Sequence, residues 1–301
     1  MYFLCNNRYF QLERVELISL RVYLLYSYKM LNKLKKHIFS PINSVKKIIY
    51  TFQSLILEIY YKESVFQRKQ DKIFSELGLD RNEGLKIFEI QKKERKAFET
   101  PMSSEHKVLF ASISCKKNYK DILEIGTHDG KNALYLSQIF PNSKVTTIDL
   151  PEDDKLFTST YERNSKEKRD KFCKERDKIL SCSKNIFFKK MNSLELCNSK
   201  ETYDLIWVDG AHGYPYVSID ITNSIRLLNE NGLLICDDVW KTKPYNQDDT
   251  YHSIASYDTL MALQEAKVLK FNTIYKRLDK KNNANEKFRK FIAIVKKFCN
   301  D

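Results

Sequence analysis

The feature that most constrains the fold of this chain is a regular alternation of short apolar runs with helical patterns, which begins near residue 121. Strands that alternate with helices at this spacing are typical of a parallel sheet with right-handed crossovers. The run LIWV at 205–208 is apolar at every position, as expected of a strand buried on both faces. Parallel strands are predicted at 121–126, 144–150, 185–191, 203–210 and 232–238, with helices at 130–139, 162–180 and 215–229.

The end of the chain carries two further apolar runs, at 269–278 and 289–298, which are joined by a polar loop rich in Lys and Asn. They are predicted to form a closing antiparallel pair of strands. A helix is also expected at about 103–114, after Thr100-Pro101. The sequence therefore predicts an α/β domain over residues 96–301.

Residues 1–95 are predicted to form an N-terminal helical extension. Asp80 and Glu83 have the spacing of a capping box before a helix that runs to about Lys96. Residues 1–60 carry nine Lys or Arg against three Asp or Glu. Basic helices with an apolar face must bury that face, so we expect them to cap a cleft, form a homodimer or contact a membrane surface peripherally. The helical spacing of apolar residues is clearest at Ile48, Ile49, Phe52, Leu55, Ile56 and Ile59.

Polar residues stand at the carboxyl end of every predicted parallel strand. In an open α/β sheet, ligands bind at this edge. One polar strand end would be a turn, whereas five together predict a binding site. In chain order, the strand ends carry Glu124 with Gly126, Asp149, Asn192 with Ser193, Asp209, and Asp237 with Asp238.

The chain has only seven glycines in 301 residues, yet Gly126 and Gly130 both follow the first predicted strand. A glycine turn after the first strand, with an acid after the second, suits a nucleoside: glycine lets the backbone approach the ligand, and the carboxylate accepts from the ribose hydroxyls. The dinucleotide pattern G-x-G-x-x-G fails here because His128 and Lys131 stand where two of its glycines belong. The remaining space suits a nucleoside that carries an amino acid.

Four segments together resemble a class I S-adenosylmethionine-dependent methyltransferase: LEIGTHDGKNALYL, TIDL, MNSLEL and DLIWVDGAHGYPYVSIDITNSIRLLNENGLLICDDVW. Within that class they are similar to the small-molecule O-methyltransferases whose fourth strand ends in an Asp-Gly-x-His-x-Tyr pattern. The resemblance covers about residues 100–298. It implies a Rossmann-like, mostly parallel sheet of seven strands with an antiparallel last strand, flanked by helices. The implied activity is methylation of a hydroxyl on a small molecule, such as a sugar or another metabolite.

The resemblance also implies how S-adenosylmethionine would be bound. The glycine loop after the first strand contacts the methionine moiety, Glu124 supports that loop, and Asp149 takes the ribose. The adenine edge is read after the third strand, where the family more often has Asp in the place of Asn192. The predicted cofactor-binding residues are Glu124, Gly126, Thr127, Gly130, Asp149, Asn192, Ser193 and Asp209.

Asp209, Asp237 and Asp238 match positions that hold a divalent ion in metal-dependent members of the family. A physical argument points the same way: residues 203–258 contain nine Asp or Glu and three Lys or Arg, in a chain of net charge +13. Converging carboxylates repel one another unless a cation compensates them, and oxygen ligands suit Mg²⁺. Such an ion would make a bound hydroxyl more acidic. The alternative, that Asp209 and Asp237 are helix caps or turn residues, stays open.

Asp209 and His212 are the predicted catalytic residues. His212 follows Asp209 by three positions, and its ordinary pKa near neutrality suits a general base that takes the proton of the substrate. A loop histidine beside a carboxylate is also often a supporting group that is merely oriented there. Both interpretations stay open.

Two alternatives to a methyltransferase stay open. One is an NAD(P)-dependent oxidoreductase on the same kind of sheet, and the other is a non-catalytic binding module with a basic docking extension. No run combines clustered Arg with interleaved aromatic residues, so no specific nucleic-acid partner is predicted. The seven scattered cysteines never form a CxxC pair, which argues against a disulfide framework and for a reducing cytoplasm. The identity of the acceptor stays open.

Overall fold

The computed structural model describes residues 41–94, 104–242, 253–279 and 289–298. The chain divides into two compact units, Met1–Ile59 and Tyr60–Asp301. The predicted boundary lay at 95/96 instead. The difference arises from α3 and α4, because Phe74 in α3 is fully buried in the same apolar cluster as residues of the sheet. Residues 1–40 of the predicted extension lie outside the described residues.

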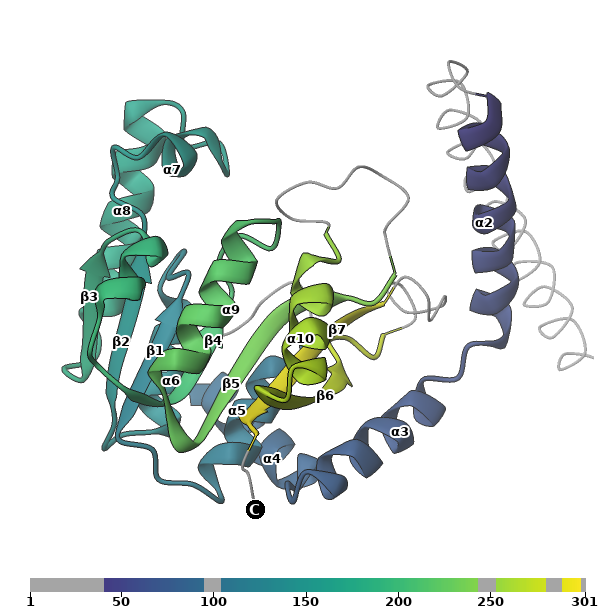
Figure 1. Ribbon diagram of the computed structural model, residues 1–301, viewed down its shortest axis with the longest axis horizontal. Coiled ribbons are helices and arrows are strands. Elements are labelled where there is room, and N and C mark those ends of the chain that lie inside the picture. Colours follow the sequence, from purple (N-terminus) through teal and green to yellow (C-terminus); the bar gives the residue numbers. More distant parts are fainter. Residues whose placement is uncertain (1–40, 95–103, 243–252, 280–288, 299–301) are drawn as a thin grey trace, which may run out of the picture. The chain divides into compact units, whose positions relative to one another are not determined.

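The described residues of the second unit contain a seven-stranded sheet with the order β3-β2-β1-β4-β5-β7-β6 (Figure 1). Strands β1 to β5 pair in parallel, whereas β7 is antiparallel to both of its neighbours, β5 and β6. This confirms the predicted Rossmann-like sheet with an antiparallel last strand. The strands are β1 (Asp121–Ile125), β2 (Lys144–Asp149), β3 (Ile186–Lys190), β4 (Tyr203–Val208), β5 (Leu228–Trp240), β6 (Leu269–Tyr275) and β7 (Lys290–Lys297).

The helices predicted between the strands are present, and several further ones accompany them. Asp80 caps α4 as expected, because its carboxylate accepts hydrogen bonds from the backbone N–H groups of Asn82 and Glu83. Helix α3 lies within the predicted helical extension, although its bounds were not predicted; α7, α10 and the 3₁₀ helix η2 were not predicted. The helices are α2 (Pro41–Tyr60), α3 (Glu63–Glu76), α4 (Arg81–Glu94), α5 (His106–Ser114), α6 (Lys131–Ile139), α7 (Lys155–Ser159), α8 (Lys166–Leu180), η2 (Ser193–Asn198), α9 (Tyr216–Leu227) and α10 (Ala255–Glu265).

Strand β4 shows why this sheet needs helices on both faces. Its side chains alternate between two apolar clusters: Leu205 and Trp207 join the cluster that contains α5 and α6, whereas Ile206 and Val208 join the one that contains α9 and α10. All four are at most 1% exposed. A strand buried on both faces must be apolar throughout, which is what the LIWV run predicted. Both faces of the sheet are therefore covered at β4, which leaves the ends of the strands as the place where a ligand can reach it.

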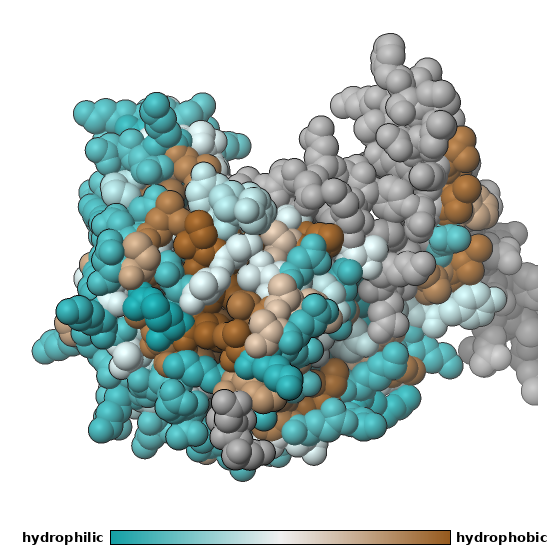
Figure 2. Space-filling view, viewed as in Figure 1, coloured by the Kyte–Doolittle hydropathy of each residue, from teal (hydrophilic) through white to brown (hydrophobic). Residues whose placement is uncertain are grey.

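Helix α2 belongs to the first compact unit and is described by itself. The helical spacing predicted over residues 48–59 is confirmed, and Figure 2 shows apolar side chains in brown along this helix. Within the part of the chain that the structure describes, no helix has the length and apolar character needed to cross a membrane. The exposed apolar residues of α2 are Val45, Ile48, Ile49, Phe52, Ile56, Leu57 and Ile59.

Candidate functional site

A cavity of about 540 Å³ lies at the carboxyl ends of the strands. Parallel strands end at one edge of a sheet, so residues far apart in the sequence meet there. Every predicted site residue lines this cavity except Gly130. The cavity has two parts. The β1–β3 half is built on the ends of the first three strands, and the β4–β6 half on the ends of β4, β5 and β6.

Glu124 is the buried centre of the β1–β3 half, with 1% of its surface exposed. It accepts hydrogen bonds from Asn132 Nδ2 at 2.8 Å and from Thr147 Oγ1 at 2.6 Å. Thr147 Oγ1 also lies 2.6 Å from Thr127 Oγ1. Burial raises the pKa of Glu124 to about 8 despite these hydrogen bonds. This carboxyl group therefore ties β1 to α6 and β2, and through Thr147 to the glycine loop.

The glycine loop has positive φ angles at Gly126 (104°), His128 (47°) and Gly130 (77°). A Cβ atom at Gly126 would lie 2.4 Å from the backbone oxygen of Asp209, in the loop after β4. The sequence analysis explained this glycine by a close ligand. The structure adds a second cause, because the fold itself brings the two loops together. At Gly130 a Cβ atom would meet Leu180 of α8 at 2.9 Å.

Asp149 at the end of β2 is held by backbone groups. Its Oδ2 accepts a hydrogen bond from the N–H of His128 at 2.9 Å, and its Oδ1 accepts one from the N–H of Leu150 at 2.8 Å. Carboxylate oxygens have several acceptor sites each, so a ligand hydroxyl can still donate to them. The contact with His128 fixes the glycine loop relative to Asp149.

The wall beyond Asp149 was not predicted. Phe157, Tyr161 and Arg163 line the cavity, and the guanidinium of Arg163 lies 3.8 Å from the centre of the Phe157 ring. The ring of His128 lies edge-on to Tyr161, with 4.9 Å between the ring centres. In the sequence, these residues lie next to a strongly charged helix. Their polar surroundings therefore gave no indication that aromatic side chains line the cavity here.

Asn192 and Ser193, after β3, also line the cavity. Asn192 forms a capping box for η2: its side chain accepts from the N–H of Leu194 at 3.0 Å, and its own N–H donates to Glu195 at 3.1 Å. Asp220 of α9 lines the same region and is 2% exposed. Its Oδ1 has no hydrogen-bond partner among the described residues, and burial raises its pKa to about 6. Asp220 could not be predicted from the sequence, because an acid in a helix is usually solvated.

The β4–β6 half contains the predicted catalytic pair. His212 Nε2 lies 3.5 Å from Asp209 Oδ1 and 3.9 Å from Asp238 Oδ2. Burial alone would lower the pKa of His212, but contact with Asp209 and the charge of Asp238 outweigh it and raise the pKa above its ordinary value. Burial and the nearby Asp237 raise the pKa of Asp209. The pKa of each of these side chains therefore depends on the charge of the others.

Two lysines contact two of the three acids of the predicted metal site, Asp237 and Asp238. The ammonium of Lys276 donates short hydrogen bonds to Asp237 Oδ2 and Asp238 Oδ1, and that of Lys290 donates to Asp238 Oδ2. These ammonium groups hold the pKa of Asp238 well below its usual range, although burial opposes the shift. Across the described part of the chain, no group of three or more His, Cys, Asp and Glu side chains is arranged to hold a metal ion.

Lys276 was not predicted, because the pattern of polar strand ends covers only the five parallel strands. Strand β6 is antiparallel to β7, and β7 is antiparallel to β5, so β6 ends at the same edge as β5. Lys276 is the residue directly after β6. His106, to which no role was assigned, also lines the cavity; its ring stacks on Trp207, and burial lowers its pKa to about 3.

Residues 123–239 match the model of a family described as a methyltransferase domain. No curated protein sequence matches the chain. Among solved structures, the cofactor-bound protein Rv0187 from MTB has a TM-score of 0.50 at 16% identity, over 72% of this chain and 90% of that one. The O-methyltransferase from Bacillus cereus in complex with SAH has a TM-score of 0.46 at 16% identity, over 75% and 96%. The O-methyltransferase TomG from Streptomyces achromogenes, in complex with SAM, has a TM-score of 0.45 at 16% identity, over 76% and 96%.

Proposed function

We propose that this protein is an S-adenosylmethionine-dependent methyltransferase that methylates a hydroxyl group of a small molecule. The observation that carries the proposal is one cavity that joins the glycine loop and Asp149 to Asp209 and His212. The match of residues 123–239 to a methyltransferase-domain model supports it. The cavity volume of about 540 Å³ is in the range of small-molecule sites.

The residues of the β1–β3 half fit this cofactor. The carboxylate of Asp149 suits a ribose, and Asn192 and Ser193 suit the edge of adenine. Asp220 supplies a second test of the fit. Asp220 lines the cavity, and its buried Oδ1, without a partner among the described residues, is an acceptor for an amino group such as that of adenine. When bound, S-adenosylmethionine supplies a methyl group on a positively charged sulfur.

The residues of the β4–β6 half suit the proton transfer that O-methylation requires. A neutral His212 takes the proton of the acceptor hydroxyl at Nε2, and the carboxylates of Asp209 and Asp238 stabilise the imidazolium that forms. Asp209 faces the same nitrogen, so it can accept a hydrogen bond from the ring only after Nε2 has taken up the proton. Most of the acceleration comes from holding the two reactants in line.

Binding measurements test the proposal first. Isothermal titration and thermal shift are expected to show that S-adenosylmethionine and S-adenosylhomocysteine bind the full chain, whereas NAD and NADP do not. The missing glycines at 128 and 131 account for the expected discrimination. Binding of NAD(P) alone would favour an oxidoreductase. Binding of neither cofactor, together with salt-sensitive attachment to anionic vesicles or RNA, would favour a docking module.

Turnover tests the role of His212. With any hydroxylated acceptor that releases S-adenosylhomocysteine, His212→Gln is expected to lower kcat by about a hundredfold or more and to change cofactor affinity little. In the wild type, kcat should rise with pH through a value above 6.5, because the base must be neutral and its pKa is raised. A variant that keeps this pH dependence would make His212 a supporting group only.

The other predictions about partners stay predictions. They are peripheral membrane contact through the basic N-terminal helices, a homodimer, the lack of a specific nucleic-acid partner, and a cytoplasmic location. The exposed apolar residues of α2 are compatible with either of the first two.

A further inference from the structure

We propose that Lys276 is the built-in cation of the β4–β6 half, that it stands where the sequence predicted a divalent metal ion, and that methyl transfer in this site needs no such ion. The absence of a metal requirement rests on the proposed function. The occupation of the acidic residues by Lys276 can be tested without it.

The contacts of Lys276 leave little room for a metal ion. Its ammonium bridges Asp237 Oδ2 and Asp238 Oδ1, while Lys290 takes the second oxygen of Asp238. The side chain of Lys276 is only 9% exposed, and that of Asp237 only 3%. A divalent ion would have to displace a buried ammonium from two carboxylates, which would leave that ammonium without its partners.

The backbone of Lys276 is held in place on both sides. Its N–H donates to the carbonyl of Lys290 at 3.0 Å, and its carbonyl accepts from the N–H of Glu105 at 2.8 Å. The preceding residue, Tyr275, exchanges two hydrogen bonds with the fully buried side chain of Gln70 in α3, at 2.9 and 3.0 Å. These hydrogen bonds fix the backbone at the end of β6, so Lys276 cannot leave the acidic cluster by a shift of that backbone.

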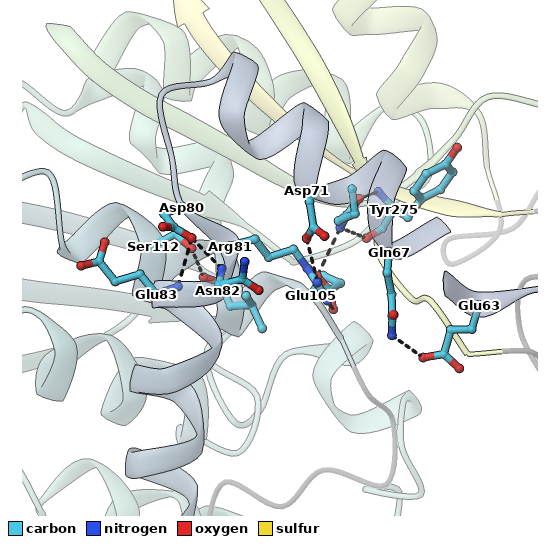
Figure 3. A network of polar contacts seen from close by, with 12 residues as sticks. Glu63, Gln67, Asp71, Asp80, Arg81, Asn82, Glu83, Glu105, Ser112 and Tyr275 are labelled. Atoms are coloured by element: carbon cyan, nitrogen blue, oxygen red, sulfur yellow. Dashed lines mark hydrogen bonds and ion pairs between the residues drawn. The ribbon is translucent and has the colours of Figure 1, made fainter. Parts of the chain in front are cut away.

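Glu105 is in turn fixed by Arg81 of α4 (Figure 3). The guanidinium donates to both oxygens of Glu105, at 2.7 and 3.0 Å, and to Asp71 of α3 at 3.0 Å. A two-point pair between arginine and a carboxylate fixes geometry as well as charge. Helices α3 and α4 therefore hold the backbone of Lys276 in position through these hydrogen bonds.

The charges of the cluster point to the same conclusion. The carboxylates of Asp209, Asp237 and Asp238 meet the two ammonium groups of Lys276 and Lys290, so the net charge is −1 with a neutral His212. Uptake of a proton by His212 brings the cluster to zero. A divalent ion would instead make it positive, at short distance from two ammonium groups. The two lysines thus compensate the negative charge of the carboxylates, which is the role predicted for a metal ion.

Lys276 lines the same cavity as His212, so its ammonium can also stabilise charge that develops on the acceptor oxygen. In the reaction, the O–H bond of the acceptor breaks and its proton goes to His212. The oxygen forms a bond to the methyl carbon as the bond from carbon to sulfur breaks, and the sulfur leaves as a neutral thioether. No step requires a further ion.

Titration with Mn²⁺, followed by electron paramagnetic resonance, tests the inference on the full chain. The wild type is expected to bind Mn²⁺ no more tightly than about 1 mM, and Lys276→Ala at least about tenfold more tightly, because Asp237 and Asp238 lose the ammonium that bridges them. Lys270→Ala is the matched control, since Lys270 is an exposed lysine of the same strand. Equal Mn²⁺ affinity in the wild type and Lys276→Ala overturns the proposal.

Two further measurements do not depend on the folding of Lys276→Ala. Micromolar binding of Mn²⁺ to the wild type that Asp238→Asn abolishes also overturns the proposal. Wild-type turnover is expected to be the same in EDTA and in Mg²⁺, and a loss in EDTA that Mg²⁺ restores contradicts it. If S-adenosylmethionine does not bind at all, the proposed function fails, while the Mn²⁺ titration still decides whether Lys276 occupies the acidic cluster.

Discussion

The two halves of the cavity hold their carboxylates by different means. In the β1–β3 half, Glu124 is bound by an amide and a hydroxyl, and Asp149 by two backbone N–H groups. In the β4–β6 half, Asp237 and Asp238 are bound by the ammonium groups of Lys276 and Lys290. Neutral donors orient an acid without compensating a charge on it, whereas an ammonium compensates that charge. One half is therefore prepared for a ligand rich in hydroxyl and amino groups, and the other for a proton transfer.

Gly126→Ala is expected to have the largest effect, because Gly126 is where the two halves touch. The substitution combines a strained positive φ with a Cβ atom 2.4 Å from the backbone oxygen of Asp209. We expect a loss of about 3 kcal/mol or more, which lowers Tm by roughly 10 °C. Differential scanning calorimetry measures it.

Gly78→Ala is the control for that experiment. Gly78 also has a positive φ, of 74°, but nothing lies within 4 Å of an added Cβ atom. It isolates the cost of the backbone angle, which is about 1 kcal/mol. Equal Tm values for the two variants would show that the contact between the halves is not a tight one.

Asp149→Ala tests whether the β1–β3 half is the part of the cavity that binds the cofactor. The variant loses the acceptors for two ribose hydroxyls, so we expect about a hundredfold weaker binding of S-adenosylmethionine by isothermal titration. Asp153→Ala removes a nearby exposed acid and should leave binding unchanged. An unchanged affinity in Asp149→Ala would end the assignment of the β1–β3 half to the cofactor.

Glu124→Gln should have an effect that depends on pH. The folded pKa of Glu124, about 8, lies above its ordinary value of 4.5, so the folded state binds more protons than the unfolded state in between. Stability of the wild type should therefore fall as the pH rises from about 5 to 8, by at most about 1.4 kcal/mol per pH unit.

Glutamine cannot ionise, so the variant should lack this loss. The difference between the two Tm values, recorded across that pH range, is the measurement. A constant difference would mean that Glu124 is ionised in the folded protein, and hence that the β1–β3 half tolerates a buried charge.

The same comparison explains what could be predicted from the sequence. Asp149, Glu124 and the glycine loop belong to a short segment, and the partners of the two acids lie 1 to 23 residues away. Periodicity and turn chemistry in that segment determine how they meet. Lys276 and Lys290 lie 38 to 52 residues from the acids that they bind, across a sheet reversal. Only the strand order shows that these charges meet, so the sequence could not predict that lysines contact the acids of the predicted metal site.

Gln70 and Tyr275 are joined across 205 residues, and this contact has a consequence for how the protein is made. A loop of that length closes late, because contacts distant in the sequence form only once the intervening chain has been ordered. During synthesis, the segment with Glu124 and Asp149 leaves the ribosome well before Lys276 does, and domains begin to fold from the N-terminal side. The two halves of the cavity are thus completed at different times, and the acidic half cannot gain its cation until the chain has been translated as far as Lys276.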